Sequence, residues 1–163
     1  DGYMDVCDAV LSRRELATRQ RILKDSHCGA FAVIGMVLLA LCQWSVFLSG
    51  SADESPWGLL LIPVATRACA GLAVLKLRPM GTSQYAAMGR HGGYAAALAV
   101  LLAAAIAVPL VTDRSFAPLA AAAGYGLAVW YGFRQLDGMN GDISGFALTL
   151  GELAGAAVWT LVR

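Results

Sequence analysis

The chain has 163 residues, of which 58% are hydrophobic and only 14% are charged, and its net charge is +1. A soluble domain usually has about a quarter of its residues charged, so this composition excludes an ordinary soluble domain and predicts a lipid environment. The small net charge gives no indication of a nucleic-acid partner, and none is predicted.

Residues 1–28 form a charged segment before the first apolar run. We predict a helix at its start, a turn at residues 12–14 and then a second, basic helix. Either Asp25 or Ser26 is expected to cap the apolar helix that follows, because both side chains can accept hydrogen bonds from free N–H groups. The sequence begins without Met, and we interpret it as a truncated form of a longer chain.

Five apolar windows follow, each close to the roughly 20 residues that a membrane-spanning helix needs. They cover residues 29–49, 57–77, 93–111, 116–133 and 145–162. The last two are short and rich in Ala and Gly, which suits close helix packing in lipid. The sequence therefore predicts an all-α fold with one membrane domain over 1–163. It would comprise a cytoplasmic acidic and basic helical segment (1–28) and a transmembrane bundle of about five spans (29–163).

The distribution of Lys and Arg predicts which ends of the spans face the cytoplasm, because these cations accumulate in short cytoplasmic loops. The segment before the first span carries Arg13, Arg14, Arg19, Arg21 and Lys24. The loops that alternation places on the same side carry Lys76, Arg78, Arg90 and Arg134, whereas the first loop on the opposite side carries Asp53 and Glu54. A site built from the polar motifs would therefore face the cytoplasm.

The acidic motif at the start of the chain places Asp1, Asp5 and Asp8 at helix positions i, i+4 and i+7. These positions share one helix face, where like charges repel each other. Magnesium prefers oxygen ligands and is usually held by one or two carboxylates together with substrate phosphates. The alternative is a solvated acidic face. Because the motif contains no Lys or Arg to offset the charge, we favour the metal site.

A second polar motif lies between the last two windows. Gly138 and Gly141 permit tight turns, and Asp137, Asn140 and Asp142 offer oxygen ligands. This loop could complete a cation or phosphate site. Asn-Gly and Asp-Gly are also ordinary turn dipeptides, so a simple interhelical turn is an equally good interpretation.

Two charged residues, Arg67 and Glu152, lie inside apolar windows. Charges in lipid are costly, so such residues face the bundle interior and usually pair or serve function. A direct Arg67–Glu152 ion pair and a polar pocket shared with a substrate are both consistent with the sequence.

The basic residues between Arg13 and Lys24 have two compatible interpretations. They can contact anionic lipid beside the first span, or they can clamp phosphate oxygens, to which Arg offers bidentate contacts. The two histidines, His27 and His91, flank span ends and are expected to be loop or cap residues.

Three separated blocks of the chain resemble the membrane-bound cobalamin-5′-phosphate synthase family (adenosylcobinamide-GDP ribazoletransferase). They are DGYMDVCDAV at 1–10, LKDSHCGAFAVIG at 23–35 and GMNGDISGFALTLGEL at 138–153. The blocks stand in the order typical of the family, and the chain lacks the upstream membrane segments. It departs from the family pattern at Ala9, where Gly is frequent, and at Asn140, where Thr is frequent.

The resemblance implies a magnesium-dependent phosphotransferase of a bacterial cytoplasmic membrane. It would join GDP-activated adenosylcobinamide to α-ribazole, or its 5′-phosphate, with release of GMP, in a late step of cobalamin biosynthesis. The metal ligands it implies are Asp1, Asp5, Asp8 and Asp142, and the catalytic residues are Asp8, Asp142 and Glu152. The substrate-binding residues would be Lys24, Asp25, Ser26, Arg67 and Asn140. Membrane lipid is a further partner, and the sequence is compatible with a homo-oligomer.

Two other functions compete with this interpretation. CDP-alcohol phosphotransferases also use a membrane helix with an Asp-Gly motif, but they carry an Ala-Arg pair and a second Asp-rich half that are missing here. A transporter could use Arg67 and Glu152 to line its pathway. Such a protein would show inverted repeats and interrupted spans in matching positions, and no convincing pair is visible.

Overall fold

Long apolar helices make up most of the computed structural model, which describes residues 1–50, 56–81, 83 and 92–161. All the regular elements of this part of the chain are helices. They are α1 (Gly2–Leu11), α2 (Leu16–Ile22), α3 (Ala30–Leu48), α4 (Pro56–Lys76), α5 (Gly92–Thr112), α6 (Ala117–Leu136) and α7 (Gly141–Leu161). The predicted all-α class is confirmed.

Four of these helices, α3, α4, α5 and α7, are long and apolar enough to cross a membrane. The predicted window at 116–133 corresponds to α6, which is equally long but is not one of these candidate spans. Its apolar character comes mainly from small Ala residues, with Tyr and Gly among them, and its last turn contains Arg134. The structure therefore supports a multi-pass helical membrane protein with four candidate spans among the described residues, and α6 completes the bundle.

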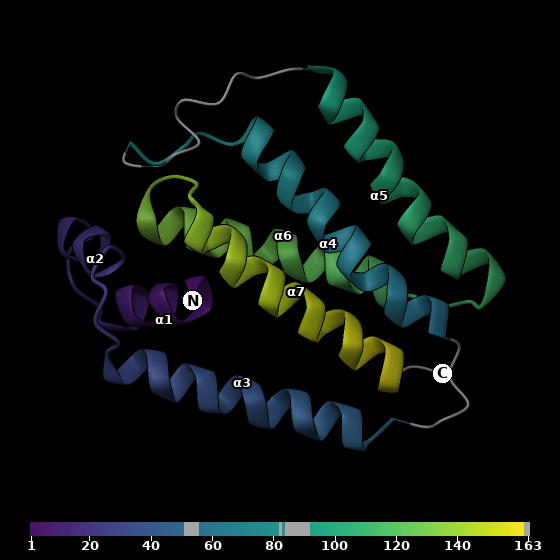
Figure 1. Cartoon of the computed structure of the whole chain (residues 1–163), viewed down its shortest axis with the longest axis horizontal. Coiled ribbons are helices and arrows are strands. Elements are labelled where there is room, and N and C mark those ends of the chain that lie inside the picture. Colours follow the sequence, from purple (N-terminus) through teal and green to yellow (C-terminus); the bar gives the residue numbers. More distant parts are fainter. Residues whose placement is uncertain (51–55, 82, 84–91, 162–163) are drawn as a thin grey trace.

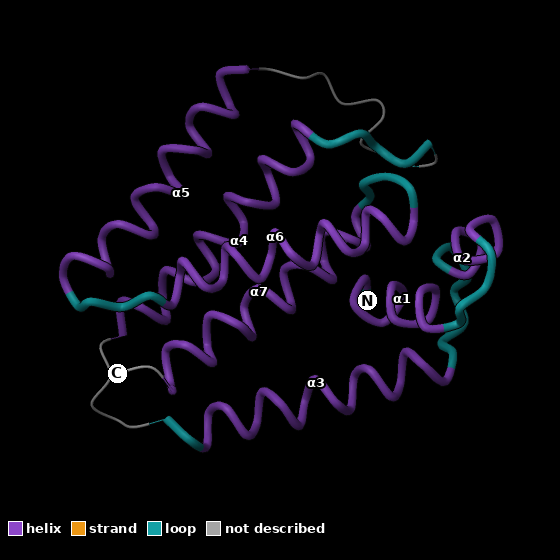
Figure 2. The backbone as a smooth tube through the Cα atoms, turned by 180° about the vertical axis from the view of Figure 1, so that it is seen from behind, coloured by secondary structure: helices purple, strands orange, loops and turns teal. Residues whose placement is uncertain are grey.

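The long helices lie side by side in the order α3, α7, α4 and α5, with α6 packed against α7 and α4 (Figure 1). Seen from behind in Figure 2, the short helices α1 and α2 lie at one end of this array, and α1 contacts both α3 and α7. Small buried residues such as Ala121, Ala128 and Ala147 fill the contact between α6 and α7, as expected for helices that approach closely in lipid.

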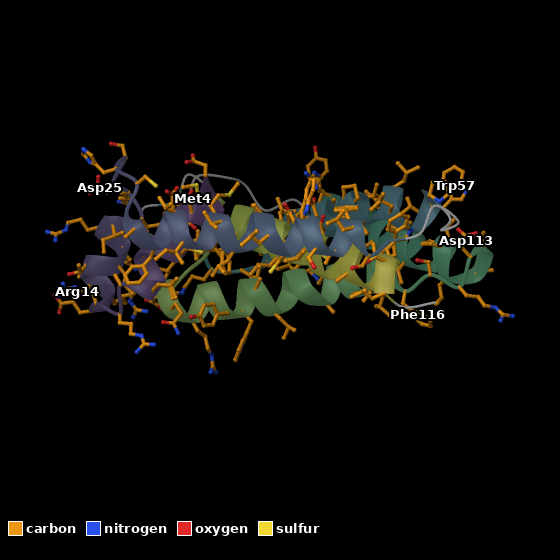
Figure 3. The ribbon with its side chains drawn as sticks, turned by 90° about the horizontal axis from the view of Figure 1, so that it is seen from below. Met4, Arg14, Asp25, Trp57, Asp113 and Phe116 are labelled. Carbon is orange, nitrogen blue, oxygen red and sulfur yellow. The ribbon has the colours of Figure 1, made fainter. Side chains whose placement is uncertain are left out.

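The two ends of the bundle carry different segments. Arg14 and Asp25 lie at one end, whereas Trp57, Asp113 and Phe116 lie at the other (Figure 3). The connections after α4 and before α7 meet each other, because the Met80 N–H donates to the Met139 carbonyl at 2.8 Å. This arrangement agrees with the predicted alternation of the loops, of which Asp53, Glu54, Arg90 and His91 lie outside the described residues.

The segment before α3 follows the predicted order of helix, turn and helix, but its cap differs. Gly29 is the N-cap residue of α3, and no side-chain hydrogen bond caps the helix at this position. The expectation that Asp25 or Ser26 caps this helix is therefore wrong. The helix begins only at Ala30, and the Asp25 carboxylate instead accepts a hydrogen bond from the His27 N–H at 3.0 Å.

Candidate functional site

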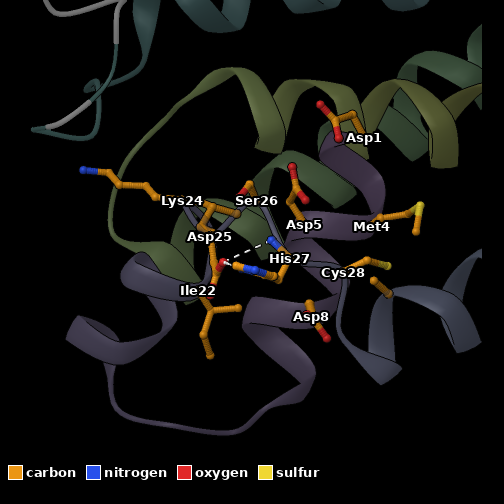
Figure 4. Close-up of a pocket in the computed structure, with 12 residues that line it drawn as sticks. Asp1, Met4, Asp5, Asp8, Ile22, Lys24, Asp25, Ser26, His27 and Cys28 are labelled. Atoms are coloured by element: carbon orange, nitrogen blue, oxygen red, sulfur yellow. Dashed lines mark hydrogen bonds and ion pairs between the residues drawn. The ribbon is translucent and has the colours of Figure 1, made fainter.

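A polar pocket of about 360 Å³ lies at the end of the bundle where α1, the 22–28 segment and the start of α3 meet. Its acidic lining comes from Asp1, Asp5 and Asp8 of α1. Lys24, Asp25, Ser26, His27 and Cys28 line its other side (Figure 4). The structure therefore brings the first two sequence blocks together around one cavity.

Helix α1 is fixed between α3 and α7 by its apolar face. The Tyr3 ring stacks on Phe146 of α7 with ring centroids 5.6 Å apart, and its hydroxyl donates to the Gly35 carbonyl of α3 at 3.3 Å. Val6 and Ala9 are fully buried in the core. Because this face is buried, the acidic face of α1 is turned toward the pocket.

Asp142 lies in the first turn of α7, and Asn140 orients it. The Asn140 Oδ1 accepts the Ile143 N–H at 2.9 Å, which caps the helix. The amide nitrogen of Asn140 is therefore left to donate to the Asp142 carboxylate, at 2.7 Å. Sequence reasoning placed Asp142 in a loop and Asn140 among the substrate ligands. The structure starts the helix at Gly141, so Asp142 lies in a helix and not in a loop, and the buried Asn140 side chain donates to its carboxylate.

The start of α1 approaches the start of α7 so closely that no side chain fits between them. A Cβ atom at Gly2 would lie 2.8 Å from both the Cα and the carbonyl oxygen of Asp142. This contact brings the Asp142 carboxylate near Asp5. Burial, followed by the negative charge of Asp142 and then that of Asp8, raises the pKa of Asp5 above its ordinary value.

The carboxylate of Asp8 lies against Gly29, where any Cβ atom would overlap it. This is the N-terminus of α3, whose free N–H groups and dipole favour a negative charge. Asp8 accordingly points away from Asp1 and Asp5 (Figure 4). The three carboxylates share a helix face as predicted, but they do not converge on one point.

Within the described ranges, no three His, Cys, Asp or Glu side chains are arranged to hold a metal ion. A complete carboxylate cage is therefore not formed. The donor chemistry nevertheless suits magnesium, because this ion needs only one or two carboxylates when substrate phosphates supply further oxygens. Asp142, whose charge interacts with that of Asp5, is the residue that best fits this requirement.

Glu152 and Arg67 form an ion pair between α7 and α4. The Thr66 hydroxyl also donates to the Glu152 carboxylate, at 3.3 Å. Glu152 stands ten residues after Asp142, which is about 15 Å along the helix, and it lines a different pocket of about 270 Å³. Of the two alternatives for these charges, the direct ion pair is confirmed. The structure does not bring either residue into the acidic pocket.

Asp137, another suggested oxygen ligand, is also held elsewhere. Its carboxylate accepts a hydrogen bond from Arg78 at 2.5 Å. The next residue, Gly138, has φ +148°, and a Cβ atom there would lie 2.7 Å from the Met80 Cα. The turn before α7 is therefore docked on the segment after α4, with the Asp137 carboxylate paired to Arg78.

The structure shows two contacts of the segment after α1 that the sequence did not predict. Arg19 donates to Gln135 at 2.5 Å and Gln20 to the Leu136 carbonyl at 2.8 Å, so α2 binds the end of α6. His27, expected to be a loop residue, lines the pocket. Its Nδ1 lies 2.6 Å from Asp25, and this hydrogen bond lowers the pKa of Asp25. In the sequence, only the position of His27 directly after Lys24-Asp25-Ser26 could have indicated that it lines the pocket.

The chain matches the family model for cobalamin-5-phosphate synthase over residues 1–160. It is 36% identical to the adenosylcobinamide-GDP ribazoletransferase of Clostridium perfringens (strain 13 / Type A), over 95% of this chain and 64% of the relative. It is 32% identical to the protein of the same name from Geobacillus thermodenitrificans (strain NG80-2), over 99% of this chain and 66% of the relative. The chain thus spans just under two thirds of the length of the first of these relatives. No solved structure matches it.

Proposed function

Because the chain belongs to the cobalamin-5-phosphate synthase family, we propose that it carries the site of an adenosylcobinamide-GDP ribazoletransferase. The observation that most directly supports this proposal is the junction of α1 and α7. There, Asp5 and Asp142 share one electrostatic environment beside a polar pocket, although they lie at opposite ends of the chain. The family relationship also sets aside the CDP-alcohol phosphotransferase interpretation.

In the proposed reaction, a hydroxyl of α-ribazole, or of its 5′-phosphate, attacks the phosphorus that is attached to cobinamide. The bond from this phosphorus to the bridging oxygen breaks, and GMP leaves with that oxygen. The hydroxyl proton passes to a base. Phosphoryl transfer of this kind depends on positioning and charge neutralisation more than on covalent participation by the protein.

Asp5 is a better candidate for the base than Asp8, which was the first choice from sequence. Burial and the adjacent carboxylates raise the pKa of Asp5, and a base is most effective when its pKa lies near the working pH. The Asp8 carboxylate, by contrast, lies against Gly29 at the N-terminus of α3 and points away from Asp1 and Asp5 (Figure 4).

Magnesium held by Asp142 together with diphosphate oxygens would supply the charge neutralisation that the departing GMP requires, which leaves Asp5 beside it to accept the proton. Asn140 keeps the Asp142 carboxylate in a fixed orientation. The ammonium of Lys24 extends away from the acidic side chains (Figure 4), so its proposed role is to attract phosphate at the pocket entrance. We place this end of the bundle in the cytoplasm, because Arg and Lys are concentrated there.

A matched pair of variants tests the proposal in membranes that contain the complete protein. Asp142→Asn should reduce GMP release from GDP-cobinamide, in the presence of α-ribazole and magnesium, by at least about 10²-fold. Asp137→Asn is the control, since it makes the same change in the same turn at a residue that pairs with Arg78. Equal rates for the two variants would contradict the assigned site, and substrate flux into vesicles without GMP release would favour a transporter.

A further inference from the structure

A second, mainly apolar groove of about 430 Å³ opens on the side of the bundle, between α4 and α6. Its lining runs from Cys69 to Lys76 on α4, includes Leu77 just after that helix, and continues from Ala122 to Phe133 on α6. The stretch on α4 covers about 10 Å along the helix axis, which is about two thirds of one leaflet of a 30 Å hydrocarbon core. The groove is separate from the acidic pocket, and the proposed reaction does not use it.

Two cations without a carboxylate partner in the described part of the chain stand at one end of this groove. Lys76, the last residue of α4, lines it directly. The guanidinium of Arg134 lies 5.0 Å from the ring centroid of Trp130, which also lines it. The Trp130 side chain is itself exposed, as is usual for tryptophan at a membrane interface. Arg78 lies close by, over Phe133, but its charge is paired with Asp137.

We propose that this groove binds one acyl chain of an acidic phospholipid, with the phosphate of the headgroup between Lys76 and Arg134. An apolar floor that ends at two unpaired cations is complementary to an amphiphile with an anionic head. Basic pockets between membrane helices bind anionic lipid headgroups in this way. A zwitterionic lipid such as phosphatidylcholine would also fill the groove, but its choline cation offsets its phosphate and leaves no net negative charge to balance Lys76 and Arg134.

Gly126 allows the groove to be closed without disturbing the protein. This residue lines the groove, and a Cβ atom built on it meets no other atom within 4 Å. A leucine at this position would therefore occupy the space of the acyl chain and would not collide with the surrounding helices. Gly93 on α5 is equally unobstructed and exposed, so Gly93→Leu is a matched control away from the groove.

The test is native mass spectrometry of the full protein, stripped of lipid in detergent and titrated with phosphatidylglycerol or with phosphatidylcholine of the same acyl chains. One phosphatidylglycerol should bind more tightly than the phosphatidylcholine. Lys76→Gln and Arg134→Gln should each weaken phosphatidylglycerol binding about fivefold and should weaken phosphatidylcholine binding less, because its headgroup has no net charge. Gly126→Leu should abolish the tight binding, whereas Gly93→Leu should retain it.

Four results would overturn the proposal. The first is equal binding of the two lipids, since no acidic headgroup would then be recognised. The second is unchanged phosphatidylglycerol binding by Gly126→Leu. The third is the absence of tight binding by the parent, as expected if protein covers the groove. The fourth is that Arg14→Gln, which removes an exposed cation outside the groove at the same end (Figure 3), weakens binding as much as Lys76→Gln, because lipid binding would then reflect only general surface charge.

Discussion

Replacing Gly2 with alanine should separate the two helices that bring Asp5 and Asp142 together. The added Cβ atom would lie 2.8 Å from the Cα and the carbonyl oxygen of Asp142, whereas ordinary van der Waals contact begins at 3.4 Å. The difference between these values, 3.4 − 2.8, means that α1 and α7 must move apart by about 0.6 Å. Both atoms that the methyl group meets belong to the backbone of α7, so no side-chain rotation can relieve the overlap.

A shift of this size should reduce activity more than it reduces stability. A misplacement of about 1 Å can lower an enzymatic rate about 10²-fold, so we expect Gly2→Ala to release GMP from GDP-cobinamide about tenfold more slowly than the parent. Overpacking costs about 1–3 kcal/mol, which the bundle can absorb. The assay is GMP release by membranes, with the unfolding temperature of the purified variants measured in parallel.

Gly145→Ala provides the control within the same contact. Its added Cβ atom would lie 3.7 Å from the Gly2 Cα, at an ordinary contact distance, so this variant should keep the parental rate. If folded Gly2→Ala retained more than half of the parental rate, the approach of α1 to α7 would not govern the spacing of the carboxylates.

Two further predictions concern charged groups. The folded-state pKa of Asp5 is raised above its unfolded value, first by burial and then by the charge of Asp142. The stability that this group contributes is therefore present at low pH and is lost as the pH rises through the folded-state pKa. At pH 7, Asp5→Asn should therefore unfold up to about 3 °C higher than the parent in differential scanning fluorimetry, and it should lose GMP release. If the difference in unfolding temperature grew in acid, the sign of this effect would be wrong. For the ion pair of Arg67 and Glu152, Glu152→Gln alone should cost about 3 kcal/mol by leaving a lone charge in an apolar helix. Adding Arg67→Met should recover much of that cost in a double-mutant cycle measured by denaturant unfolding, and strictly additive losses would show that the pair contributes no coupling.

Hydropathy was sufficient to predict the long helices, because runs of about 20 apolar residues form helices in lipid whatever their partners. It was less informative at their ends. The start of α7 was placed at Gly145, where the apolar run begins, but the helix starts at Gly141 because Asn140 caps it. The residues left out of the predicted helix form its polar first turn, which contains the candidate site residue Asp142.

Local spacing predicted that the acidic residues of α1 share a face, but not where each carboxylate points. Asp8 is directed by the start of α3 at Gly29, a contact that no local pattern reveals. Likewise, the local sequence does not distinguish Asp137 from Asp142. The ion pair of Asp137 depends on the position of Arg78 in the fold. Partner choice among charged groups is a tertiary property, which explains why the geometry of the candidate site could not be predicted from the sequence.

The junction of α1 with α7 also bears on how the protein matures. Asp5 emerges from the ribosome before its neighbour Asp142, which follows only after α3, α4, α5 and α6 have been synthesised. Until α7 has been inserted and packed, α1 has no surface on which to stack Tyr3, and its carboxylates have no counterpart. A chain interrupted before α7 would therefore carry the acidic motif but could not place Asp142 beside Asp5, and on the proposed function it would release no GMP.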